Sequence, residues 1–113
     1  MKPYLIVFIL VLSGCASSSV QLLSAEQYPS KNSECPLDVF TSESKVTKKY
    51  KEIAIITHKT KQDAFSDKGA SSIIPELKEE ACKLGADGLI VRSVQQGTWG
   101  EPGHGEAIAF KYQ

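Results

Sequence analysis

The pattern of hydrophobic and polar positions predicts four β-strands in this chain. The segment YKEIAIITH at 50–58 has a continuously apolar, β-branched middle, which is typical of a buried strand. Residues 89–94 begin apolar on both faces, as a central strand does, and residues 107–112 alternate in the manner of a half-buried strand. A shorter β-prone run lies at 37–41. We therefore expect strands at these four ranges, with polar connections between them.

The hydrophobic period changes to that of a helix from Ile73 onward. Apolar residues recur at i, i+3, i+7 and i+10, at Ile74, Leu77, Ala81 and Leu84. Pro75 suits the first turn of a helix, and Gly85 suits the left-handed position that follows the last turn. Cys82 falls at the edge of the apolar stripe, where it can reach a neighbouring segment.

The predicted order is strand, strand, helix, strand, strand, which indicates a small single-domain α+β fold. We expect one sheet with the single helix packed on one face. A crossover through the helix favours residues 50–58 running parallel to residues 89–94. The last two strands should form an antiparallel hairpin across the glycine-rich loop that joins them.

The N-terminus has the pattern of an export signal. Lys2 precedes an uncharged apolar run, YLIVFILVL at 4–12, and the small residues Ser13 and Gly14 follow it. At ~1.5 Å per residue this run spans about half of a ~30 Å hydrocarbon core, so a permanent transmembrane helix is not expected.

The four residues LSGC at 12–15 resemble the lipobox of bacterial lipoproteins. The resemblance implies that the Cys15 thiol carries diacylglycerol, that residues 1–14 are removed, and that the new amino terminus is acylated. Several acyl chains make such an anchor effectively permanent. Ala16 follows the cysteine, and by the same resemblance this favours the outer membrane, facing the periplasm. The alternative is an ordinary signal peptide in which Cys15 is incidental.

The mature chain divides into two parts on this interpretation. Residues 15–34 are Ser-rich and polar and lack a sustained period, which predicts a lipidated N-terminus and flexible tether of up to about 60 Å. Residues 35–113 are expected to form the globular α+β domain.

With Cys15 assigned to lipid, Cys35 and Cys82 form an even pair in an exported protein, and we expect a disulfide between them. In the chain-entropy model, a disulfide that closes the long loop between these two cysteines stabilises the folded state by on the order of 4 kcal/mol. The alternative is a free loop thiol at Cys35 and a small apolar helix residue at Cys82.

Composition excludes few classes of function. The whole chain carries 13 basic and 13 acidic side chains, for a formal net charge of zero. Nucleic-acid binding is therefore not expected, because it requires a net basic face.

The segment ACKLGADGLIV at 81–91 resembles the helix-to-strand signature A-x-x-L-G-A-D/N-A-V of the YbjQ-like family and of RcsF-like bacterial lipoproteins. The resemblance implies a compact α+β domain and, for the RcsF-like lipoproteins, envelope-stress sensing through protein contacts. Those lipoproteins have four domain cysteines and a proline-rich tether, whereas this chain has two mature cysteines and a Ser-rich tether. Gly88 also stands where the signature has alanine.

Catalytic chemistry is not indicated, and we expect no enzyme, cofactor or metal site. The two histidines, His58 and His104, lack a close ligand spacing and are expected to be exposed, at a strand end and in a loop. The pair Cys35 and Cys82 lacks the C-x-x-C spacing of redox sites.

The glycine-rich loop at 97–105 carries the single tryptophan, Trp99, together with His104. Trp99 and His104 are candidate partner-binding residues, because tryptophan is enriched in interface hot spots. The favoured alternative is that Trp99 folds back to cover the sheet.

The sequence thus predicts a non-enzymatic, lipid-anchored bacterial envelope protein that contacts the membrane through its anchor and binds or senses another envelope protein. A small-ligand or metal-binding oligomeric module using His58 and His104 is a second hypothesis. A structural accessory lipoprotein is a third.

Overall fold

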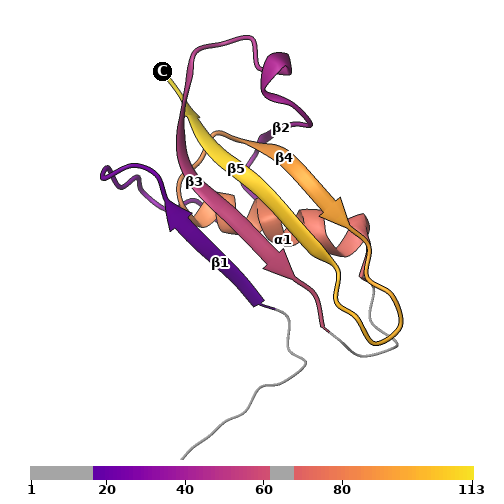
Figure 1. Ribbon diagram of the computed structural model, residues 1–113. Coiled ribbons are helices and arrows are strands. Elements are labelled where there is room, and N and C mark those ends of the chain that lie inside the picture. Colours follow the sequence, from indigo (N-terminus) through magenta and orange to yellow (C-terminus); the bar gives the residue numbers. More distant parts are fainter. Residues whose placement is uncertain (1–16, 62–67) are drawn as a thin grey trace, which may run out of the picture.

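The computed structural model describes residues 17–61 and 68–113 (Figure 1). In these residues five strands and one α-helix occur, with a single 3₁₀ turn. The elements are β1 (Ser17–Leu22), β2 (Asp38–Phe40), the 3₁₀ turn (Glu43–Lys45), β3 (Tyr50–Lys59), α1 (Ala70–Lys83), β4 (Gly88–Gln95) and β5 (His104–Tyr112). No helix of the described segments is both long and apolar enough to span a bilayer.

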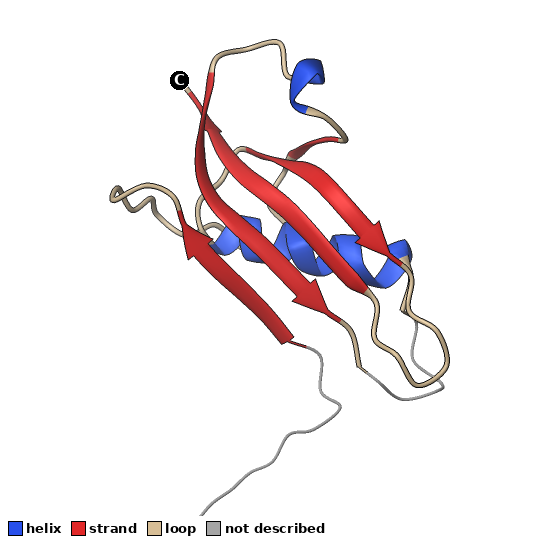
Figure 2. Ribbon diagram, viewed as in Figure 1, coloured by secondary structure: helices blue, strands red, loops and turns tan. Residues whose placement is uncertain are grey.

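The five strands form one open mixed sheet in the order β1-β3-β5-β4-β2. Only β2 and β4 pair in parallel, and the other three pairs are antiparallel. α1 lies across one face of the sheet, behind the strands in Figure 2. This is the α+β single domain with one helix on one face that the sequence predicts.

β1 corrects the predicted domain boundary. Residues 17–22 pair along their whole length with β3, from Ser17 opposite Lys59 to Leu22 opposite Ala54, so these six residues belong to the sheet and not to a flexible tether. The strand is short and lies at the sheet edge, with every residue exposed. β1 therefore lacks the run of buried apolar residues by which the central strands are predicted from the sequence.

β5 is the central strand of the sheet, and it is more buried than predicted. It lies between β3 and β4 and is antiparallel to both, so β3 and β4 run in the same direction without being neighbours. Its residues from Ala107 to Phe110 are buried on both faces, whereas alternation predicted a half-buried strand. The small and large residues alternate because the two faces of the sheet carry different cores.

The helix face holds the main core. Ile73, Leu77 and Ala81 of α1 are fully buried against the alanines of β3 and β5. Gly105 lies under α1, and an added Cβ there would meet the side chain of Ile73. Small residues in the sheet thus allow the helix to approach closely.

α1 begins before Ile73, where the predicted helical period starts, and it ends just before Gly85, as predicted. It starts at Ala70, so Pro75 lies inside the helix and not in its first turn. At its end the Gly85 N–H donates to the Cys82 carbonyl (3.0 Å) and the Ala86 N–H donates to the Ala81 carbonyl (3.0 Å). With Gly85 at φ +76°, this is a Schellman motif.

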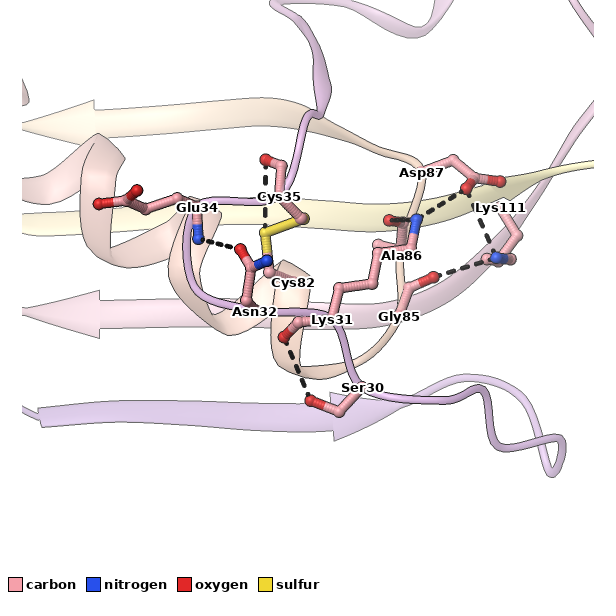
Figure 3. Close-up of a disulfide and its surroundings, with 10 residues drawn as sticks. All are labelled: Ser30, Lys31, Asn32, Glu34, Cys35, Cys82, Gly85, Ala86, Asp87 and Lys111. Carbon is pink, nitrogen blue, oxygen red and sulfur yellow. Dashed lines mark hydrogen bonds and ion pairs between the residues drawn. A yellow bond between two sulfur atoms is a disulfide. The ribbon is translucent and has the colours of Figure 1, made fainter.

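A strap, residues 23–37, connects the two edges of the sheet. It leaves β1 at one edge, passes the C-terminal end of α1, and enters β2 at the other edge. The predicted disulfide between Cys35 and Cys82 is confirmed and joins the strap to the helix, with a Cα–Cα distance of 5.9 Å (Figure 3). The Lys31 N–H adds a hydrogen bond of 2.8 Å to the Cys82 carbonyl.

Asp87 connects the strap to the last strand. Its carboxylate accepts hydrogen bonds from the Tyr112 N–H (2.9 Å), the Lys31 ammonium (3.2 Å) and the Lys111 ammonium (3.4 Å). Burial acts to raise the pKa of this carboxyl, but the hydrogen bonds and the two lysine charges outweigh it and hold the pKa below the ordinary value of 3.8. The aspartate of the 81–91 segment therefore has a structural role.

Gly88, where the signature has alanine, is explained by Phe110. A Cβ at Gly88 would collide with the Phe110 ring and would lie 2.6 Å from the Asp38 carbonyl oxygen. The absent methyl group allows a fully buried aromatic side chain on the neighbouring strand.

Two glycines with positive φ provide a matched test of the strap. At Gly85 a new Cβ would lie 2.5 Å from the Pro29 carbonyl oxygen, whereas at Gly100, with φ +83°, it meets nothing within 4 Å. Gly100→Ala should lower the free energy of unfolding by about 1 kcal/mol through backbone strain alone. Gly85→Ala should cost a further ~1–3 kcal/mol because it displaces the strap. Urea unfolding of the oxidised protein measures both, and equal losses would contradict the strap packing.

Candidate functional site

The face of the sheet opposite α1 is divided into an aromatic half and a polar half. In the aromatic half Phe110 contacts Phe40, Tyr50 and Tyr112, with ring centroids 5.1 to 6.2 Å apart. From the connection between β2 and β3, Val46 packs against the Phe110 cluster, and the Lys48 ammonium lies over the Tyr112 ring, 4.9 Å from its centroid. This half is therefore a second small core, and the polar half is the accessible surface.

The polar half forms an open groove of about 360 Å³ across four strands. The residues that face it in the strand register are Ser17, Ser19, Thr57, Lys59, Ser93, Gln95, His104 and Glu106. They alternate with residues of the helix face, so each strand contributes every second side chain. We call this surface the polar groove.

The charges of the polar groove are partly paired. Arg92 lies 3.4 Å from the Glu106 carboxylate, beside the point where the β4–β5 register shifts. The Ser19 and Thr57 hydroxyls are hydrogen-bonded across β1 and β3 at 2.5 Å. The groove therefore presents hydroxyl, amide, ammonium and imidazole groups, which suits recognition of a polar ligand by hydrogen bonds.

A second hollow of about 400 Å³ lies beside the first, with Arg92 at its edge. It holds the carboxyl groups of Glu43 and Glu52. Burial raises the pKa of the Glu52 carboxyl, and hydrogen bonding to Glu43 raises it further, while the charge of Arg92 opposes the rise. Arg92 thus lies between Glu106 of the polar groove and the two carboxyl groups of the second hollow.

His58 differs from the prediction. It was expected to be exposed at a strand end, but only 5% of it is exposed, and its Nδ1 lies 2.7 Å from the Ser18 hydroxyl. His58 is opposite Gly105 in the register and so faces the helix side of the sheet. β1 covers this ring, so the burial of His58 depends on a strand that the sequence analysis does not predict.

His104 is exposed and lies on the groove side, opposite Lys59 and Gln95. Because His58 and His104 project from opposite faces of the sheet, they do not form a joint ligand pair. Among the described residues, no group of three or more His, Cys, Asp or Glu side chains is placed to hold a metal ion.

Trp99 is 83% exposed, in the connection between β4 and β5. The favoured expectation that it folds back over the sheet is therefore wrong. Its exposure leaves it available as a contact residue, although it is not among the residues that line the polar groove. Cys15 lies outside the described residues.

The sequence alone did not predict the polar groove, and one reason is that it did not predict β1, which forms one side of the groove. One signal was present: in SSSVQL the apolar Val20 and Leu22 alternate with the polar Ser19 and Gln21, which is the period of a strand. The polar residues of β3 and β4 gave no signal of their own, because single polar residues near strand ends are common.

Comparison with known proteins identifies the fold without identifying a family. No protein-family model matches the sequence, and no curated protein matches it. The structure is similar to the crystal structure of the Francisella virulence factor FvfA, with a TM-score of 0.63 and 12% sequence identity. The match covers 85% of this chain and 98% of the FvfA chain. At this identity the likeness shows a shared fold.

The hydrogen bond between Ser18 and His58 tests whether β1 belongs to the folded domain. Ser18→Ala leaves a buried imidazole without its hydroxyl partner and should lower the free energy of unfolding by about 1–3 kcal/mol. Ser19→Ala removes an exposed hydroxyl on the other face, where water can replace its hydrogen bond to Thr57, and should cost only about 0.5 kcal/mol. Urea unfolding measures the difference, and two equally small losses would indicate that β1 is not stably paired with β3.

Proposed function

We propose that this protein is a lipid-anchored component of the bacterial cell envelope, held on the outer membrane facing the periplasm, whose α+β domain binds another envelope component without catalysing a reaction. The observation that carries the proposal is the lipobox-like LSGC at 12–15, placed directly before the first strand of the domain. A cysteine in this position is explained by lipid attachment, because it takes no part in the Cys35–Cys82 disulfide.

The disulfide supports export. Structural disulfides form and persist in oxidising compartments such as the periplasm and are rare in the bacterial cytosol. Cys35 and Cys82 are both buried, and the bridge holds the strap on the end of the helix. A reducing compartment would remove this link from a small domain.

The polar groove supports binding. It is wide, open and lined by hydrogen-bonding groups on four strands, and its charged groups are exposed or partly exposed. Such a surface fits a polar segment of a partner, whereas an active site needs an activated nucleophile or a matched acid and base. Envelope-stress sensing, implied by the resemblance at 81–91, is a finer form of this proposal.

The anchor is tested by removing the thiol. Cys15→Ala should abolish lipid attachment, so the protein should leave the membrane fraction and lose the mass of its acyl chains, both measured after export in a bacterial host. The matched control is the double variant Cys35→Ala, Cys82→Ala, which should keep its lipid and remain in the membrane fraction. A membrane-bound, acylated Cys15→Ala protein would overturn the proposal.

The binding surface is tested by photocrosslinking in intact envelopes. A photoreactive residue at exposed position 93, within the polar groove, should give a discrete crosslinked species that excess unlabelled protein reduces. The control position is Lys78, which is exposed on α1. Absence of crosslinks from position 93, or the same products from both positions, would contradict the assignment of the groove.

A further inference from the structure

One end of the sheet carries the start of β1 together with the exposed tryptophan. The register places Ser17, Lys59, His104 and Gln95 side by side in one row across β1, β3, β5 and β4. Strands spaced about 4.8 Å apart put the ends of this row roughly 14 Å from each other. The connection between β4 and β5, residues 96–103, projects past this row at the same end of the sheet (Figure 1).

The chain between the predicted lipid attachment point and this row is very short. Only Ala16 separates Cys15 from Ser17, where β1 begins. Two residue steps extend at most about 8 Å. This step rests on the proposed lipid anchor: with acyl chains on Cys15, the row and the connection beyond it are held within reach of the membrane surface. The tether of about 60 Å expected from the sequence would have left the domain free of it.

Trp99 occupies the tip of a hydrogen-bonded turn. The Glu101 N–H donates to the Thr98 carbonyl at 2.9 Å, which closes the turn over Trp99 and Gly100. Gly100 has φ +83°, as position i+2 of a type II turn requires. The Thr98 hydroxyl also donates to the Glu101 carboxylate at 2.8 Å. The turn therefore fixes the backbone at Trp99 and leaves its indole exposed.

The base of this turn is attached to the domain on both sides. On one side the Lys68 ammonium donates to the Thr98 carbonyl (3.0 Å), and the Gly97 N–H donates to the Lys68 carbonyl (3.0 Å). On the other side the Thr60 N–H donates to the Gly103 carbonyl (3.0 Å), and the Gly103 N–H donates to the Thr60 hydroxyl (2.8 Å). The tryptophan is thus 83% exposed on a fixed support.

We propose that the Trp99 turn inserts its indole into the interfacial region of the membrane and forms a second contact, beside the lipid anchor, that fixes the orientation of the domain. An exposed indole is unfavourable in water but suits the membrane interface, where its apolar ring and its N–H are both accommodated. Lys59 and Lys61 are exposed at the same end and complement anionic headgroups. Glu101, also exposed, has its carboxylate engaged by Thr98.

A lipid surface fits this site better than a protein groove does. The attachment point lies within two residues of the row, so the lipid surface is the partner that is always within reach. A membrane contact here leaves the polar groove open on one face of the sheet, next to the bilayer. A partner bound in the groove would then lie close to the membrane.

The inference is tested by the fluorescence of the full lipidated chain, in which Trp99 is the single tryptophan. The protein is reconstituted into vesicles of phosphatidylethanolamine and phosphatidylglycerol, after intact mass has established the lipid on Cys15. Trp99 emission should shift to the blue relative to the unlipidated Cys15→Ala protein in buffer. It should be quenched when brominated phospholipids replace the ordinary ones, and it should be protected from acrylamide.

The matched control moves the tryptophan to the other end of the sheet. Val39 is 41% exposed on β2 and pairs with Leu89 at the start of β4, far from the row at Gln95. In the Trp99→Ser, Val39→Trp variant the emission should stay accessible to acrylamide and insensitive to brominated lipid.

Three results would overturn the inference. A lipidated protein whose Trp99 remains accessible to acrylamide and unquenched by brominated lipid would refute the membrane contact and leave the anchor intact. Shielding of Trp99 that appears in native envelope membranes but not in pure lipid vesicles would make the occupant a protein. Absence of lipid on Cys15 would overturn the anchor and the inference together.

Discussion

The attachment of the strap to the end of α1 is the constraint on which the rest of the structure depends. The strap carries the chain from one edge of the sheet to the other, and the Cys35–Cys82 bond holds it against the helix on the way. Gly85 allows the close approach, because its missing side chain leaves room for the Pro29 carbonyl. Asp87 then connects the strap, through Lys31, to the last strand. Both edge strands, β1 and β2, are therefore fixed by one short region at the end of the helix.

The position of β1 connects the fold to the proposed function. β1 covers His58 and forms one side of the polar groove. It begins only two residues after Cys15, so it also places the proposed lipid attachment point next to the sheet. The groove, the row of strand ends and the Trp99 turn consequently share one end of the molecule (Figure 1). A domain anchored at that end would present its groove beside the membrane, whereas a domain on a long tether would present it in any direction.

The residues of the segment at 81–91 that match the family signature have structural roles in the helix end and the core. Leu84 ends the helix, and Gly85 forms the Schellman motif. Ala86 is part of the main core. The Asp87 carboxylate connects the strap to β5. Gly88 departs from the pattern because Phe110 occupies the space of the usual methyl group. Each of these residues is explained by stability, so the function of the protein has to be sought in the groove, the turn and the N-terminus.

The sequence by itself determined the elements that depend on neighbouring residues: the α+β class, the helix end at Gly85, the four strands after residue 35 and the pairing of Cys35 with Cys82. Periodicity, glycine conformation and cysteine count are local or compositional signals, and they need no knowledge of the partner segment. Only the tertiary structure decided that residues 17–22 form an edge strand, that β5 lies between β3 and β4, that His58 is buried and that Trp99 is exposed. These features depend on contacts between segments far apart in the chain. An exposed edge strand is stabilised by hydrogen bonds to the neighbouring strand, so its own sequence shows little of the hydrophobic pattern that predicts a strand.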